Sequence, residues 1–129
     1  LNSRSAVISV GFGAHKMLLT GDLGRPGEAA LMRVSRPGEL EADFIKVGHH
    51  GSADASRDEF LRRVGADLAA ISVGGNAYGL PDPETMARLQ SRTAVVLTTR
   101  EHGAVMIESD GRQWKAAAMA APLPGREVP

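Results

Sequence analysis

The sequence predicts an α/β fold, in which strands and helices alternate along the chain and helices cover a sheet. Apolar, β-branched runs at 16–20, 43–48, 67–73 and 94–98 have the length and composition of strands. The segments between the first three runs carry helix start signals, and a further helix precedes the fourth. Two more strand-like runs flank an Asp-Gly pair at 110–111, which predicts a closing hairpin.

Composition narrows the class of protein. The chain has 129 residues, 43% of them hydrophobic and 23% charged, which is typical of an ordinary globular domain. Lys and Arg (15) balance Asp and Glu (15), so there is no basic excess to bind nucleic acid or an anionic membrane nonspecifically. No cysteine is present, so a metal would need His and carboxylate ligands. No apolar run approaches the roughly 20 residues of a membrane span.

The N-terminal part predicts a β-hairpin. Residues 5–10 form its first strand, the glycine-bearing segment 11–14 its turn, and 16–20 its second strand. His15 then falls in the turn region, and His102 falls in a turn after the fourth run. Both histidines are expected to be exposed polar residues.

Two of the predicted helices follow from local signals. The first opens near 26–28 and presents Ala30, Leu31 and Val34 on one apolar face. The second begins at 56–59 with a capping box, in which the serine accepts from a helix amide while the glutamate three residues later reaches back.

The strand at 43–48 ends in two adjacent histidines, His49 and His50. Adjacent residues on a strand point to opposite faces, so both rings serve one site only where the strand has ended, which Gly51 permits. One histidine would then coordinate metal while the other contacts substrate, bridges a second metal or moves a proton. The alternative is a solvated loop pair. Ser52 lacks the strained elbow of a serine nucleophile and is expected to donate a hydrogen bond or cap a helix.

Other polar residues follow neighbouring strands. Asp22 lies at a strand-to-helix turn, where a carboxylate can bind divalent ions and Gly21 lets the backbone turn sharply; the alternative is a turn aspartate that satisfies local amides. The glycine-rich loop 74–81 contains Asn76 and precedes a helix capped by Asp82. Because ligands bind at the carboxyl ends of strands in such folds, these residues and the histidines are predicted to lie at one edge.

Taken in order, T-G-D, K-V-G-H-H-G-S and S-V-G-x-N-x-Y-G-x-P resemble the metallo-β-lactamase fold. More narrowly, they are similar to the soluble domain at the carboxyl end of ComEC-type DNA-uptake (competence) proteins, over residues 2–114. The resemblance implies an αββα sandwich of which 1–116 is the C-terminal half, with a mixed sheet, flanking helices and a terminal hairpin. The small residues and prolines of 117–129 predict a disordered tail or linker. The chain begins at Leu1 and is expected to be a piece of a longer protein.

The resemblance also implies a site for two divalent ions, zinc or manganese. Asp22 would bridge them and His49 would be a histidine ligand, with His50 left open for that role. Otherwise His50 would contact the scissile phosphate or protonate the leaving oxygen, and Ser52 and Asn76 would contact substrate. The family's first-half motif H-x-H-x-D-H supplies most ligands and is absent, so the isolated chain is expected to be inactive and to bind metal weakly or not at all.

The resemblance implies a phosphodiesterase or nuclease that acts on DNA during uptake. Its partners would be DNA, the missing N-terminal half and a membrane channel domain of the same protein. The protein would be a membrane-associated bacterial one, with this soluble domain outside the cytoplasm. Leu80 stands where relatives have His, and an apolar side chain neither coordinates metal nor relays protons. A metal-free binding or structural module, or a metallo-hydrolase of an ester, lactone, thioester or cyclic nucleotide, therefore stays open.

Overall fold

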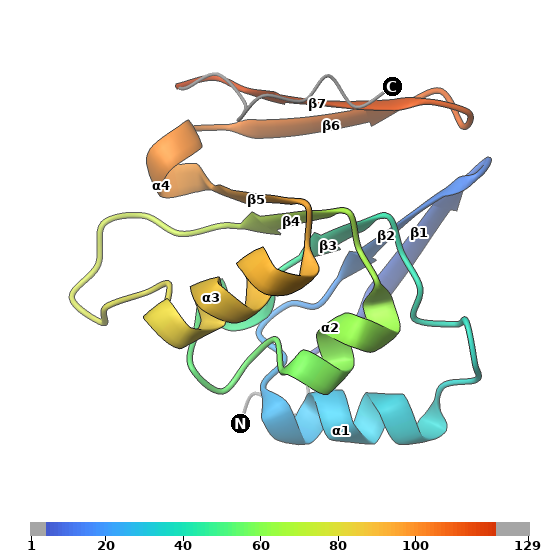
Figure 1. The fold of residues 1–129 in the computed structure, drawn as a ribbon, viewed down its shortest axis with the longest axis horizontal. Helices are drawn as coiled ribbons and strands as arrows, with labels where there is room; N and C mark the ends of the chain where they lie inside the picture. The colour runs from blue at the N-terminus through green and yellow to red at the C-terminus, as the bar shows by residue number, and fades with distance from the viewer. Residues whose placement is uncertain (1–4, 121–129) are drawn as a thin grey trace.

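The computed structural model describes residues 5–120 and has a layered architecture (Figure 1). A five-stranded sheet lies between a layer of helices and a two-stranded hairpin. This arrangement confirms the predicted α/β class with a mixed sheet, flanking helices and a terminal hairpin. No helix within residues 5–120 is long and apolar enough to cross a membrane.

The five strands of the large sheet follow each other in space as they do in sequence. They are β1 (Ile8–Phe12), β2 (His15–Leu19), β3 (Phe44–Lys46), β4 (Leu68–Ile71) and β5 (Val95–Thr98). β1 and β2 are antiparallel, whereas β2, β3, β4 and β5 run parallel. The helices are α1 (Arg25–Val34), α2 (Asp58–Val64), α3 (Pro83–Arg92) and the short α4 (Thr99–His102). The hairpin pairs β6 (Val105–Ser109) with β7 (Trp114–Ala118).

The first hairpin is present, but its turn is tighter than predicted. Phe12 pairs directly with His15, so the strands extend into the segment expected to be a longer turn. His15 therefore lies in β2, where it is half-buried and its Nδ1 is 2.7 Å from Ser109 Oγ in the second hairpin. His102 is also half-buried, because it belongs to the unpredicted helix α4 and its Nδ1 is 3.1 Å from the carbonyl oxygen of Thr98. The expectation that both histidines are exposed is wrong.

The core occupies both faces of the large sheet. Helices cover one face, where the largest fully buried side chains include Leu18, Ile45, Val47, Phe60, Val64, Ile71 and Leu89. On the other face Phe44 packs against Trp114 of the hairpin, edge to face, with ring centroids 4.6 Å apart. Strands buried on both faces explain the continuous apolar runs in the sequence.

One predicted core position lies outside this core. Val34 is 79% exposed, because it is the last residue of α1 and the chain leaves the helix at Ser35. At the other end of the chain, Ala117 and Ala118 belong to β7 rather than to the predicted tail. Residues 121–129 of that tail lie outside the described residues.

The predicted capping box at the start of α2 is also wrong. Arg57 is the N-cap residue and makes no side-chain cap, and the buried Ser56 Oγ has no hydrogen-bond partner. The amides of Ser56 and Arg57 instead donate to the carboxylate of Glu28 in α1, which is only 2% exposed. Burial raises the pKa of Glu28, and the two backbone hydrogen bonds oppose that rise. The predicted cap of α3 is confirmed, since Asp82 accepts from two amides of that helix.

Removal of the Glu28 carboxylate is expected to destabilise the fold. Glu28→Ala leaves two amides without their acceptor, so the free energy of unfolding should fall by about 1–3 kcal/mol in urea denaturation. The matched control is Glu84→Ala, because Glu84 is an exposed carboxylate 3.9 Å from Arg88 and should contribute about 0–1 kcal/mol. Equal effects of the two substitutions would contradict a capping role for Glu28.

Glu28 should also make the free energy of unfolding depend on pH. Because its pKa in the folded chain lies above the ordinary 4.5, the folded state holds the proton more tightly than the unfolded state. The free energy of unfolding should therefore fall as pH rises from about 4.5 through the raised pKa of the folded state. Glu28→Gln should flatten this part of the stability curve, measured by urea denaturation over a pH series. An unchanged slope in Glu28→Gln would contradict the assignment.

Candidate functional site

The histidines lie in a tight turn after β3, here called the histidine turn (Gly48–Gly51). β3 ends at Lys46, before both histidines, which meets the condition predicted for the two rings to serve one site. His49 and His50 have φ of 47° and 54°, in the left-handed region that costs a residue with a side chain roughly 1–2 kcal/mol. Such backbone strain persists only where the surroundings hold it, and it concentrates at functional sites.

The histidine turn is docked on the turn that carries Asp22. The amide of His49 donates to the carbonyl oxygen of Gly21 at 3.1 Å. Gly48 allows this approach, because a Cβ there would lie 2.7 Å from the carbonyl oxygen of Leu23 and 3.2 Å from Thr20 Oγ1. The two predicted strand ends therefore meet, as the sequence indicated.

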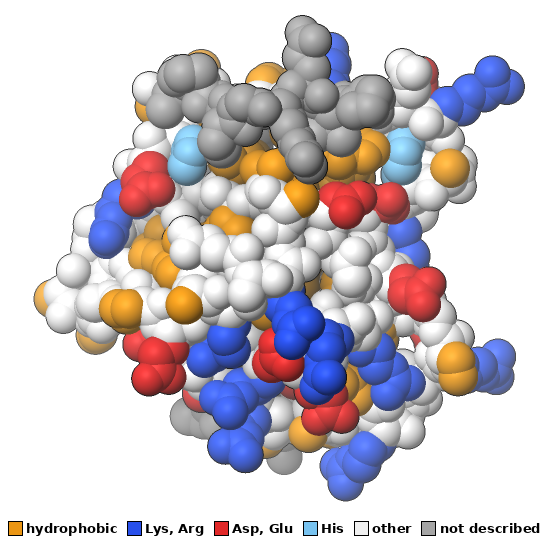
Figure 2. Space-filling model, viewed as in Figure 1, with side chains coloured by type: hydrophobic (Ala, Val, Ile, Leu, Met, Phe, Trp, Pro, Cys, Tyr) orange, Lys and Arg blue, Asp and Glu red, His pale blue; other side chains and the backbone are white. Residues whose placement is uncertain are grey.

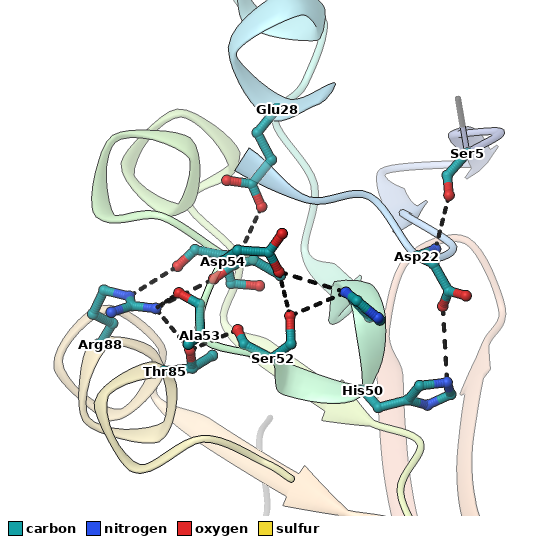
Figure 3. A network of polar contacts seen from close by, with 12 residues as sticks. Ser5, Asp22, Glu28, His50, Ser52, Ala53, Asp54, Thr85 and Arg88 are labelled. Atoms are coloured by element: carbon teal, nitrogen blue, oxygen red, sulfur yellow. Dashed lines mark hydrogen bonds and ion pairs between the residues drawn. The ribbon is translucent and has the colours of Figure 1, made fainter. Parts of the chain in front are cut away.

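The docking brings Asp22 and His50 side by side (Figure 3). His50 Nε2 is 3.8 Å from Asp22 Oδ1, and both side chains are about half exposed. The other ring nitrogen, Nδ1, lies 2.7 Å from the carbonyl oxygen of Ser72. A carbonyl oxygen only accepts, so Nδ1 carries the proton and the lone pair of the neutral ring is on Nε2, which faces Asp22.

This pair has the chemistry of a partial metal site. Zinc lies about 2.0–2.1 Å from an imidazole nitrogen and about 2.0–2.2 Å from a carboxylate oxygen, so a nitrogen and an oxygen that share one ion are at most about 4.3 Å apart, with the ion midway between them. The separation of 3.8 Å between His50 and Asp22 fits that limit. A carbonyl that fixes the tautomer of a ligating histidine is a common supporting contact. Within residues 5–120 no three His, Cys, Asp or Glu side chains group to hold a metal.

The ring of His49 contacts different partners. Its Nδ1 lies 3.1 Å from Ser52 Oγ and 3.5 Å from Asp54 Oδ1, and Ser52 Oγ donates to Asp54 Oδ1 at 2.5 Å. The hydrogen bond from Ser52, together with the contact to His49, holds the pKa of Asp54 below its usual value. The geometry thus pairs Asp22 with His50, the option left open above, while a metal-ligand role for His49 stays a prediction.

Sequence reasoning missed two contributors to this site. One is Asp54, whose only sequence signal is a carboxylate two residues after Ser52. The other is the carbonyl group of Ser72 at the end of β4, which has no signal in residue types because any residue supplies a carbonyl.

Asn76 shapes the loop after β4. Its amide nitrogen donates to the carbonyl oxygens of Gly74 and Leu80, and its amide oxygen accepts from the backbone of Tyr78 and Leu80. The end of this loop reaches the histidine turn, since the amide of Asp82 donates to the carbonyl oxygen of Gly51 at 2.8 Å. A substrate contact by Asn76 stays a prediction.

Comparison with known proteins defines the class. Residues 1–75 of the 129-residue chain match the family model of the metallo-beta-lactamase superfamily, and the chain belongs to this superfamily. The family and the observed sheet agree with the predicted fold.

The curated relatives point to a narrower context. The chain is 34% identical over 112 residues to ComE operon protein 3 of Bacillus subtilis, 34% over 105 residues to Competence protein ComA of Neisseria gonorrhoeae, and 36% over 107 residues to Recombination protein 2 of Haemophilus influenzae. These matches cover 86%, 81% and 82% of this chain. They cover only 14%, 15% and 13% of the relatives, so the chain spans a small part of each.

The docking of the histidine turn can be tested at Gly48. Gly48→Ala places a methyl group against the carbonyl oxygen of Leu23, and the overpacking should lower the free energy of unfolding by about 1–3 kcal/mol. Gly74→Ala is the control, because a Cβ there has nothing within 4 Å and should change stability by less than about 0.5 kcal/mol. Thermal denaturation of both variants measures the difference, and similar values would contradict the close docking.

Proposed function

We propose that this chain supplies part of the active site of a metal-dependent hydrolase, a phosphodiesterase or nuclease that acts on DNA during uptake. The observation that carries the proposal is the 3.8 Å approach of His50 Nε2 to Asp22 Oδ1, with the His50 tautomer fixed by a carbonyl group. The superfamily and the competence proteins among the relatives support a hydrolase-fold domain with a competence-related role.

Asp22 and His50 would hold a zinc or manganese ion together with ligands from an upstream H-x-H-x-D-H segment. Such ions lower the pKa of bound water toward neutrality and neutralise charge on phosphoryl oxygens. His49 would either complete the ligand set or move a proton at the leaving oxygen, since its Nδ1 is occupied by Ser52 and Asp54. The sequence gave the metal first to His49 and the proton to His50, whereas here His50 is the proposed ligand and His49 keeps both options.

We place DNA at this site, and the helices carry acidic as well as basic side chains. Figure 2 shows acidic and basic side chains intermixed on the helical part of one face. Arg62 and Arg92 both pair with Asp58, and Arg88 lies 3.9 Å from Glu84. These two carboxylates offset only part of the charge of the three arginines, and metal ions held by Asp22 and His50 would supply positive charge for a phosphate at the site itself. The upstream half and a membrane channel domain of the same protein are the further partners we propose.

A noncatalytic module of the uptake channel is the second candidate. It is favoured by Leu80, which by the resemblance stands where relatives have His, and which packs partly buried against the core. The two functions differ in metal content, because a channel module needs no divalent ion while the hydrolase requires one.

The test uses the domain together with its upstream half. Asp22→Ala and His50→Ala should each lower metal content, measured by elemental analysis, and should lower DNA hydrolysis by more than about 100-fold, beyond the range for residues that only support ligands. Asp58→Ala is the control, because it removes an exposed carboxylate paired with Arg92. Full hydrolysis by the Asp22→Ala/His50→Ala double variant would overturn the proposal. A metal-free wild-type domain without hydrolysis would favour the channel module.

A further inference from the structure

We propose that Asp54, acting through Ser52, is a positioning residue for His49 and keeps its ring proton on Nδ1. The inference deepens the proposed function and rests on it for the use of His49. The relay joins the imidazole of His49, in the histidine turn, to the hydroxyl of Ser52 and the exposed carboxylate of Asp54, in the segment that follows the turn. Figure 3 shows Ser52 and Asp54 next to each other.

The direction of the relay follows from the donor count. Ser52 Oγ has one proton, and the bond of 2.5 Å to Asp54 Oδ1 uses it, because a carboxylate only accepts. The 3.1 Å contact between Ser52 Oγ and His49 Nδ1 then requires the imidazole to be the donor. The 3.5 Å approach of Asp54 Oδ1 to the same nitrogen favours the same tautomer. In the neutral ring of His49 the lone pair is therefore on Nε2.

Neighbouring helices hold this segment in place. From α3, Thr85 Oγ1 donates to the carbonyl oxygen of Ser52 at 2.9 Å, and the guanidinium of Arg88 donates to the carbonyl oxygens of 53, 55 and 56. From α1, the Glu28 carboxylate accepts from the amides of Ser56 and Arg57. Figure 3 shows Glu28 and Arg88 on either side of the segment that carries Asp54. Because contacts from α1 and α3 already fix this segment, little further conformational entropy is lost when Ser52 and Asp54 orient His49.

The start of α1 is shaped around the Asp54 carboxylate. Arg25, the first residue of α1, donates its amide to the carbonyl oxygen of Asp54 at 2.7 Å. A Cβ at the preceding Gly24 would lie 2.7 Å from Asp54 Oδ2, so glycine at this position leaves room for the carboxylate. The positive end of a helix also favours an anion there. Gly24→Ala would thus displace Asp54 without changing its chemistry.

A fixed Nδ1–H tautomer serves either role of His49. Coordination of an ion and acceptance of a proton both need the lone pair on Nε2, and a carboxylate behind the other nitrogen orients the ring. The contacts of Asp54 are to Ser52 Oγ and His49 Nδ1, so its effect on the site would pass through these two residues.

The experiment reads the tautomer of His49 directly. Nitrogen-15 chemical shifts of the imidazole are measured in the metal-free domain, prepared with its upstream half, at about pH 8.5, two units above the ordinary histidine pKa. Wild type should show the Nδ1–H form. Ser52→Ala, Asp54→Ala and Gly24→Ala should each shift His49 toward the Nε2–H form.

The control is Asp58→Ala, which removes a carboxylate that pairs with Arg92 and should leave the tautomer unchanged. In the metal-loaded domain the Asp54→Ala variant should lose about 10- to 100-fold in metal affinity or hydrolysis. An Nε2–H form in wild type, or an unchanged Nδ1–H form in folded Ser52→Ala and Gly24→Ala, would overturn the proposal. Failure to bind metal or hydrolyse DNA would instead count against the proposed function, since the tautomer is read without either.

Discussion

The docking of the histidine turn on the Gly21 turn is the contact on which the site depends. One hydrogen bond, from the amide of His49 to the carbonyl oxygen of Gly21, joins the ends of β2 and β3. The missing side chain at Gly48 lets the two backbones approach. Parallel pairing of β2 with β3 brings both ends to one edge of the sheet, and this contact then sets Asp22 opposite His50.

The left-handed histidines show how the fold maintains a costly conformation. Their strain is opposed by contacts on all sides of the histidine turn: the Gly21 carbonyl group from one side, the amide of Asp82 from another, and the segment held by Glu28 and Arg88 behind Ser52. The two rings consequently separate, one toward Asp22 and one toward Asp54. A pair of adjacent histidines can in this way serve two tasks within one site.

The sequence allowed much of the fold to be predicted, because buried parallel strands leave continuous apolar runs and the Asp82 cap of α3 is a local signal. Long-range contacts were not predictable. The predicted capping box was wrong because Glu28, distant in sequence, accepts from the amides of Ser56 and Arg57 just before α2. His15 was predicted to lie in an exposed turn, but the turn is tighter than expected, so His15 lies in β2 with its ring next to Ser109. The sequence predicted that Asp22 and the two histidines lie at one edge of the sheet. Which histidine faces Asp22 could not be predicted, because it depends on the ring orientations set by the left-handed backbone at 49–50.

Anomalous diffraction tests the pairing of Asp22 with His50 most directly, on crystals of the domain with the proposed upstream half, grown with zinc or manganese. This pairing predicts an ion about 2.0–2.2 Å from His50 Nε2 and from a carboxylate oxygen of Asp22, with His50 Nδ1 still on the carbonyl group of Ser72. An ion bonded to Asp22 and His49, with His50 outside the coordination sphere, would contradict it.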